Sequence, residues 1–126
     1  MVDPQRTVLV IDDDPVILRL LEVNFEMEGF AVRMAGDGME GLDAARAERP
    51  DVIVSDVMMP RMTGLELLAG LKADDATSSI PVILLSAKAQ ASDVRAGLDA
   101  GADDYVTKPF EPLDLVDRVL KLLPRV

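Results

Sequence analysis

The sequence contains no cysteine and no histidine. Without cysteine there can be no disulfide bond, no thiolate nucleophile and no zinc site built on thiolates. Without histidine there is no imidazole to act as a general base, and the commonest ligand of transition metals is missing. Any chemistry of this chain must therefore use carboxylates, hydroxyl groups and amines.

Long hydrophobic runs and positive charge are also scarce. No apolar run approaches the ~20 residues that a helix needs to cross a bilayer, and the opening MVDPQRTV lacks the features of a signal peptide. We therefore predict a soluble, cytoplasmic protein without membrane insertion. The formal net charge of −10 opposes direct contact with nucleic acid, and it favours basic protein surfaces or hard cations as partners.

The chain has the length and composition of one globular domain. It has 126 residues, of which 49% are hydrophobic and 29% charged, so we expect residues 1–126 to form a single domain. Short apolar runs alternate with segments that carry helical signals, a pattern typical of an α/β protein whose parallel sheet is covered on both faces. The predicted strands are residues 8–11, 30–32, 52–54, 81–85 and 105–106.

Helix signals stand between these runs. Asp14 can cap a first helix that begins at Pro15 and ends near Gly29. Further helices are predicted over residues 37–49, 64–73 and 112–123. The segment 91–101 is a weaker helix, because Gly97 costs it about 1 kcal/mol and only Val94 and Leu98 are large apolar anchors. We expect it to be the loosest element of the fold.

Candidate functional residues stand at the ends of four of the five predicted strands. Asp12 and Asp13 come after the first strand, Asp56 after the third, Ser86 after the fourth and Lys108 after the fifth. Ligands of open parallel sheets bind beyond the carboxyl ends of the strands, so these groups should converge in one crevice. Carboxylates, a hydroxyl and an ammonium are the groups that phosphoryl transfer requires. A bound cation would offset the repulsion of neighbouring carboxylates, about 4 kcal/mol per pair at close range.

Four stretches together are similar to receiver domains of two-component response regulators, including the chemotaxis regulators. These are VLVIDDDP, VIVSDVMMPRMTGLELL, PVILLSA and GADDYVTKPF. The resemblance implies a flavodoxin-like, doubly wound sheet of five parallel strands in the order 2-1-3-4-5. It also implies a phosphorylation switch rather than an enzyme in the usual sense, since such a domain catalyses only its own phosphorylation and dephosphorylation.

The same resemblance assigns a role to each polar residue. Asp56 is implied to be the phosphoacceptor, and Lys108 to contact the phosphoryl group. Ser86 is implied to move toward that group, and Tyr105 to be the aromatic switch. The implied ligands of Mg²⁺ (or Mn²⁺) are Asp13, Asp56, the backbone carbonyl of Met58 and, through water, Asp12 of the acid pocket.

Partners follow from the same interpretation. Because the chain has no histidine, the phosphohistidine donor must be another protein, either a histidine kinase or a histidine phosphotransfer protein. We expect a downstream protein target and no direct nucleic-acid partner. A phosphorylation-dependent homodimer stays open.

The main alternative is a phosphatase of the haloacid dehalogenase type, with Asp12 as nucleophile and Asp14 as acid. It is disfavoured because it leaves Asp56 and Lys108 without a role, and because Pro15 begins a regular helix where those enzymes have an irregular turn. The motif GDGMEG at residues 36–41 fits a dinucleotide-binding pattern, but its two acidic residues would repel a pyrophosphate. We interpret it as a turn and helix start in which a glycine relieves backbone strain.

Overall fold

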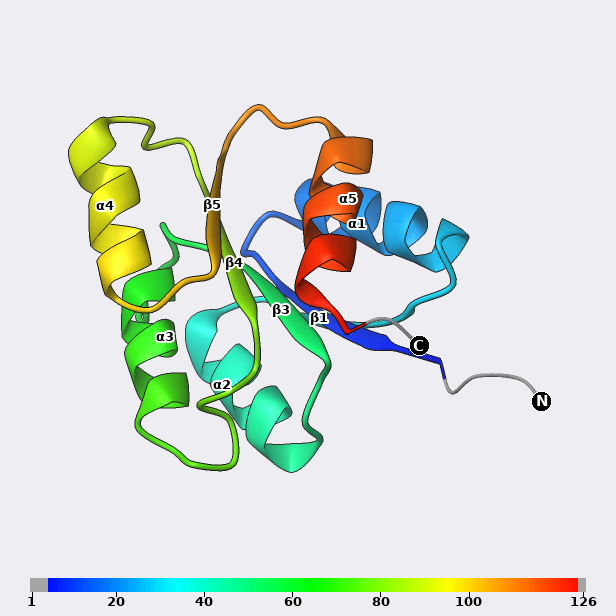
Figure 1. Cartoon of the computed structure of the whole chain (residues 1–126), viewed down its shortest axis with the longest axis horizontal. Coiled ribbons are helices and arrows are strands. Elements are labelled where there is room, and N and C mark those ends of the chain that lie inside the picture. The colour runs from blue at the N-terminus through cyan, green and yellow to red at the C-terminus, as the bar shows by residue number, and fades with distance from the viewer. Residues whose placement is uncertain (1–4, 125–126) are drawn as a thin grey trace.

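The computed structural model describes residues 5–124, in which five strands and five helices alternate along the chain (Figure 1). The strands are β1 (Thr7–Ile11), β2 (Ala31–Ala35), β3 (Val52–Asp56), β4 (Val82–Ser86) and β5 (Asp104–Thr107). The helices are α1 (Pro15–Met27), α2 (Gly38–Ala47), α3 (Gly64–Lys72), α4 (Ala91–Asp99) and α5 (Pro112–Leu122).

All strand pairs are parallel, and the order is β2-β1-β3-β4-β5, as predicted. Every residue of β3 and β4 is buried, which explains why these strands are nearly continuous apolar runs. The predicted second strand was placed too early: β2 extends to Ala35 and includes Arg33. That charge is tolerated at the sheet edge because its guanidinium donates hydrogen bonds to the carbonyls of Ala44 and Glu48.

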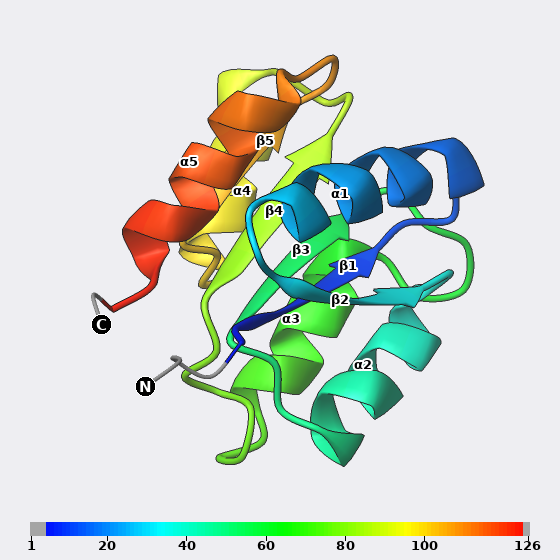
Figure 2. The same ribbon diagram turned by 90° about the vertical axis from the view of Figure 1, so that its right-hand side faces the viewer.

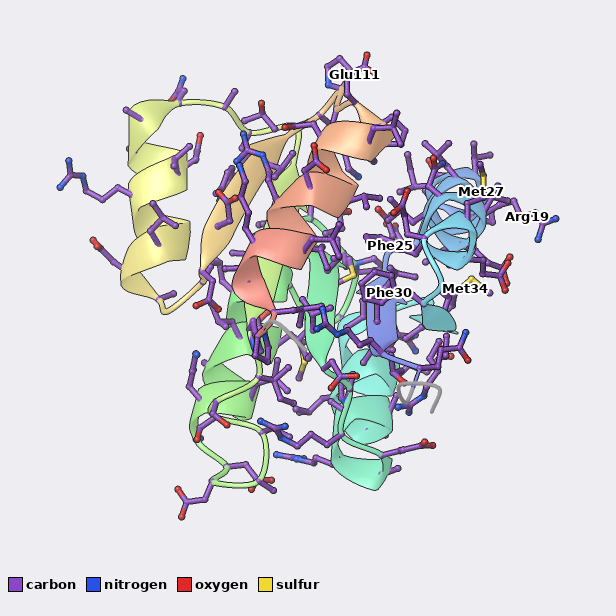
Figure 3. All side chains as sticks on the ribbon, turned by 45° about the vertical axis from the view of Figure 1, so that its right-hand side comes forward. Arg19, Phe25, Met27, Phe30, Met34 and Glu111 are labelled. Atoms are coloured by element: carbon purple, nitrogen blue, oxygen red, sulfur yellow. The ribbon has the colours of Figure 1, made fainter. Side chains whose placement is uncertain are left out.

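Helices cover both faces of the sheet. Helices α1 and α5 lie on one face, and α2, α3 and α4 lie on the other (Figure 2). Beneath α1, the rings of Phe25 and Phe30 meet edge to face with their centroids 5.5 Å apart (Figure 3). None of the helices within residues 5–124 has the length and apolar character needed to cross a membrane.

The predicted starts of the first two helices are confirmed by their side-chain caps. The side chain of Asp14 accepts a hydrogen bond from the amide of Val16, and Asp37 caps α2 in the same way. Gly38 serves a different purpose from the predicted one. A Cβ atom there would lie 2.7 Å from the carbonyl oxygen of Met62, so this glycine allows two segments to approach closely and does not relieve backbone strain.

Helix α4 forms where predicted, but its anchors differ. Val94 packs against the core as expected, whereas Leu98 is 44% exposed and anchors nothing. Among the residues of α4, all of which are described, only Gly97 is buried. A helix with so few apolar contacts depends on close backbone packing.

Candidate functional site

Three carboxylates converge at the carboxyl ends of β1 and β3. These strands are neighbours in the sheet, so Asp12 and Asp13, which follow β1, meet Asp56, the last residue of β3. One carboxylate oxygen from each lies within 4.8 Å of the others. Asp12 and Asp56 are buried and Asp13 is exposed, so the cluster is open to solvent on one side. Oxygen-only donors at this spacing suit a hard divalent cation.

Lys108 reaches the same cluster from the end of β5. Its ammonium nitrogen Nζ lies 3.1 Å from Oδ2 of Asp12 and 3.3 Å from Oδ1 of Asp56. Its backbone amide donates to the carbonyl of Ser86, which fixes the lysine beside the end of β4. The peptide bond that follows, to Pro109, is cis. Lys108 therefore supplies part of the positive charge that offsets the repulsion among the acids.

The charges of this cluster shift one another's proton affinity. Burial raises the pKa of Asp56 above 3.8, and the nearby charge of Asp12 raises it further, while Lys108 opposes both effects. For Lys108, burial alone would lower the pKa. The hydrogen bond and charge of Asp12, with the charge of Asp56, outweigh burial and raise it. The lysine is therefore held in its charged form.

Gly64, the first residue of α3, allows the chain to pack closely against Asp56. A Cβ atom at Gly64 would overlap the carbonyl oxygen of Asp56, and the amide of Gly64 donates to the carbonyl of Val57. The loop between β3 and α3 can fold back over the strand end only because this position has no side chain. The sequence signal for this turn is Thr63 followed by Gly64. Thr63 forms a capping box with Glu66, and such a motif marks the start of a helix.

Ser86 ends β4, the strand beside β3, and is linked to Tyr105 of β5 through one residue. The Ser86 Oγ accepts a hydrogen bond from the amide of Lys88 at 3.0 Å, and the Tyr105 hydroxyl donates to the carbonyl of Lys88 at 2.9 Å. Within the described residues, Ser86 makes no hydrogen bond to a carboxylate. Tyr105 is 8% exposed, so its ring lies buried in an inward position.

The remaining predicted residues occupy separate positions. Met58 lies two residues beyond Asp56 in the loop that leads to α3, and its carbonyl remains a predicted metal ligand. Asp14 is occupied as the cap of α1 and is not part of the cluster. This assignment removes the acid that a phosphatase of the haloacid dehalogenase type would need, and that alternative is not favoured.

Comparison with known proteins gives a consistent result. The family model described as response regulator receiver domain matches residues 8–120. The transcriptional regulatory protein CseB of Streptomyces coelicolor is 46% identical over 121 residues, covering 96% of this chain and 50% of that protein. The DNA-binding response regulator MtrA of Mycolicibacterium smegmatis is 43% identical over 121 residues, covering 96% of this chain and 52% of that protein.

Solved structures agree with the fold. The chemotaxis protein CheY4 of Vibrio cholerae superposes with a TM-score of 0.90 at 31% identity, covering 95% of this chain and 100% of that one. The receiver domain of Francisella response regulator 1452 gives a TM-score of 0.88 at 40% identity, covering 94% of this chain and 96% of that one.

The expectation of no direct nucleic-acid partner is contradicted by the relatives, since MtrA is named as a DNA-binding response regulator. The chain spans about half the length of the curated relatives that it matches. The prediction rested on the net charge of these 126 residues. Such a charge says nothing about the DNA binding of proteins about twice as long, which is why the inference was wrong.

Proposed function

The chain belongs to the family of response regulator receiver domains, and we propose that Asp56 is its phosphoacceptor. A carboxylate oxygen of Asp56 attacks the phosphorus atom of a phosphohistidine on another protein. The bond between phosphorus and the imidazole nitrogen breaks, and its electron pair returns to the ring. The observation that carries this proposal is the position of Asp56: it ends a fully buried strand, is 5% exposed, and contacts Lys108.

The acidic cluster would hold the divalent cation. We propose that Mg²⁺ (or Mn²⁺) binds Asp13, Asp56 and the carbonyl of Met58, with Asp12 acting through water. The cluster fits such an ion because it offers closely spaced carboxylate oxygens without any nitrogen or sulfur donor. When bound, the cation neutralises charge on the phosphoryl oxygens.

Lys108, Ser86 and Tyr105 would convert this chemical change into a signal. In the proposal, Lys108 forms an ion pair with a phosphoryl oxygen, and the Ser86 hydroxyl turns to donate to another. Because Ser86 and Tyr105 share the backbone of Lys88, a movement of Ser86 changes the acceptor of the Tyr105 hydroxyl. The chain then acts as a switch whose only catalysis is its own phosphorylation and dephosphorylation.

The names of the relatives support a proposal for the output. CseB is named a transcriptional regulatory protein and MtrA a DNA-binding response regulator. We propose that phosphorylation of this chain likewise controls binding to DNA.

Phosphotransfer from purified histidine kinases tests the main proposal. Each kinase is autophosphorylated with labelled ATP and then mixed with this chain, either with Mg²⁺ or with EDTA. We expect label to move from at least one kinase in the presence of Mg²⁺ only, and peptide mapping to place it on Asp56. Label on another residue, or transfer that is equally fast in EDTA, would overturn the assignment.

A further inference from the structure

Helix α4 touches the ring of Tyr105 with its bare backbone. A Cβ atom at Gly97 would lie 2.8 Å from Cδ2 and 3.1 Å from Cε2 of Tyr105, and 3.2 Å from Cδ1 of Leu84. Carbon atoms do not pack at the shortest of these distances, so a side chain at position 97 requires something to move. Because glycine weakens a helix relative to alanine, its place in the last turn of α4 calls for a reason, and this contact supplies one.

We propose that Gly97 is the positioning residue that allows Tyr105 to occupy its inward place. The ring is held there from two directions, since its hydroxyl donates to the carbonyl of Lys88 and its Cδ2 and Cε2 atoms lie against Gly97. Any side chain at position 97 displaces the ring of Tyr105 from this buried place and so changes the surface formed by α4 and β5. The meaning of that shift for signalling rests on the proposed function, but the packing role of Gly97 does not.

The surroundings determine whether Tyr105 or Leu84 moves when a side chain is introduced at position 97. Leu84 is fully buried in the central strand β4, between β3 and β5, and has no free direction. Tyr105 has one, because a hollow of about 270 Å³ lies beside it, lined in part by Phe110 and Arg118. The ring can therefore leave toward α5, whereas the leucine cannot leave the sheet.

The chain offers a direct probe of this movement, because it contains one tyrosine and no tryptophan. Its ultraviolet fluorescence therefore reports on Tyr105. In the parent, the buried ring should be quenched weakly by acrylamide. In Gly97→Ala the quenching constant should rise toward that of N-acetyltyrosinamide.

The matched control is Gly70→Ala in α3. Its Cβ atom would meet the flexible end of the Leu42 side chain at 3.2 Å and lies away from the tyrosine, so the quenching constant should stay at the parental value. An unchanged quenching constant in Gly97→Ala, with a parental circular dichroism spectrum, would show that α4 moves and the ring does not. That result overturns the proposal.

A second measurement covers the case in which Gly97→Ala folds poorly. The substitution is repeated in a Tyr105→Val background, where the new methyl group no longer meets a ring. We expect Gly97→Ala to lower the melting temperature strongly, or to abolish folding, beside tyrosine, and to lower it much less beside valine, where only the 3.2 Å approach to Leu84 remains. Equal losses in both backgrounds would overturn the positioning role.

Phosphorylation of Asp56 is measured separately in the same variants. Gly97→Ala should still be labelled by acetyl phosphate with Mg²⁺, because position 97 contacts no residue of the acidic cluster. If the parent itself is not labelled at Asp56, the proposed function fails while the fluorescence result stands.

Discussion

The ammonium nitrogen of Lys108 lies 3.3 Å from a carboxylate oxygen of Asp56. This contact joins the ends of β5 and β3, which are separated in the sheet by β4. It places a positive charge beside the proposed phosphoacceptor before any phosphoryl group arrives. The same lysine contacts Asp12, so one cation serves two buried carboxylates.

The first prediction concerns the site of labelling. Acetyl phosphate with Mg²⁺ should label the parent on Asp56, and Asp56→Asn should abolish the label because the amide is not a nucleophile for this reaction. Mass spectrometry of the intact protein measures the outcome. Asp14→Asn is the control, since asparagine caps a helix as well as aspartate does, and it should be labelled like the parent. Labelling that persists in Asp56→Asn and disappears in Asp12→Asn would favour the phosphatase-type alternative.

A second prediction separates metal binding from folding at Asp13. This side chain is exposed and makes no hydrogen bond to any of residues 5–124 in the structure, so its main local effect without metal is repulsion of the other two carboxylates. Asp13→Asn should weaken Mg²⁺ binding strongly in calorimetric titration, yet leave the metal-free melting temperature equal or higher. Asp43→Asn on the surface of α2 removes one charge elsewhere and should change neither value. A metal-free melting temperature that drops by several degrees would reveal a structural role for Asp13.

A third prediction follows from the raised pKa of Asp56. A carboxyl group whose pKa is higher in the folded protein binds its proton more tightly there than in the unfolded chain. Its contribution to stability is therefore present below the ordinary value of 3.8 and is lost as the pH rises through the raised folded-state pKa. Asn cannot ionise, so the metal-free melting temperature of Asp56→Asn should exceed that of the parent increasingly as the pH rises from 3.8 to neutrality. A difference that shrinks over this range would contradict the direction of the shift.

A fourth prediction tests Lys108 as a shared counter-charge. Lys108→Met leaves two buried carboxylates without their positively charged partner. Because the lysine is only 22% exposed, water screens its ion pairs with Asp12 and Asp56 only in part. The substitution should therefore reduce the metal-free free energy of unfolding by about 2 kcal/mol. Urea denaturation measures this loss, and added Mg²⁺ should recover part of it. Lys88→Met is the control, because only the backbone of Lys88 takes part in the contacts at the site. Equal stability of both variants would remove Lys108 from the electrostatic balance.

Much of the site was predictable because parallel topology brings all strand ends to one edge. Asp12, Asp56 and Lys108 each follow an apolar run, and that observation alone places them together. Distances between elements could not be predicted in this way, because residue types do not encode them. The contact of Gly97 with Tyr105 depends on how closely α4 approaches β5, and the close approach at Gly38 depends on a loop.

One error and one omission have the same origin. Leu98 was expected to be an anchor because α4 has few large apolar residues, but their number does not fix which side faces the sheet, and the ring of Tyr105 occupies the space beside Gly97. The bridge through the backbone of Lys88 left no sequence signal either, since any residue could supply the same amide and carbonyl.

The final prediction concerns this bridge. The Ser86 Oγ accepts a hydrogen bond from the amide of Lys88, and the carbonyl of Lys88 accepts one from Tyr105. Ser86→Ala removes the hydroxyl through which a phosphoryl group can act on this loop, so the variant should still be labelled on Asp56 but respond weakly beyond it. Amide NMR with beryllofluoride as the phosphoryl mimic measures the response over residues 91–123. Ser78→Ala, distant in the loop before β4, should respond like the parent.

A ligand shifts a conformational equilibrium only through its differential interaction with the two states. Shifts over residues 91–123 as large in Ser86→Ala as in the parent would therefore mean that the coupling does not pass through this hydroxyl.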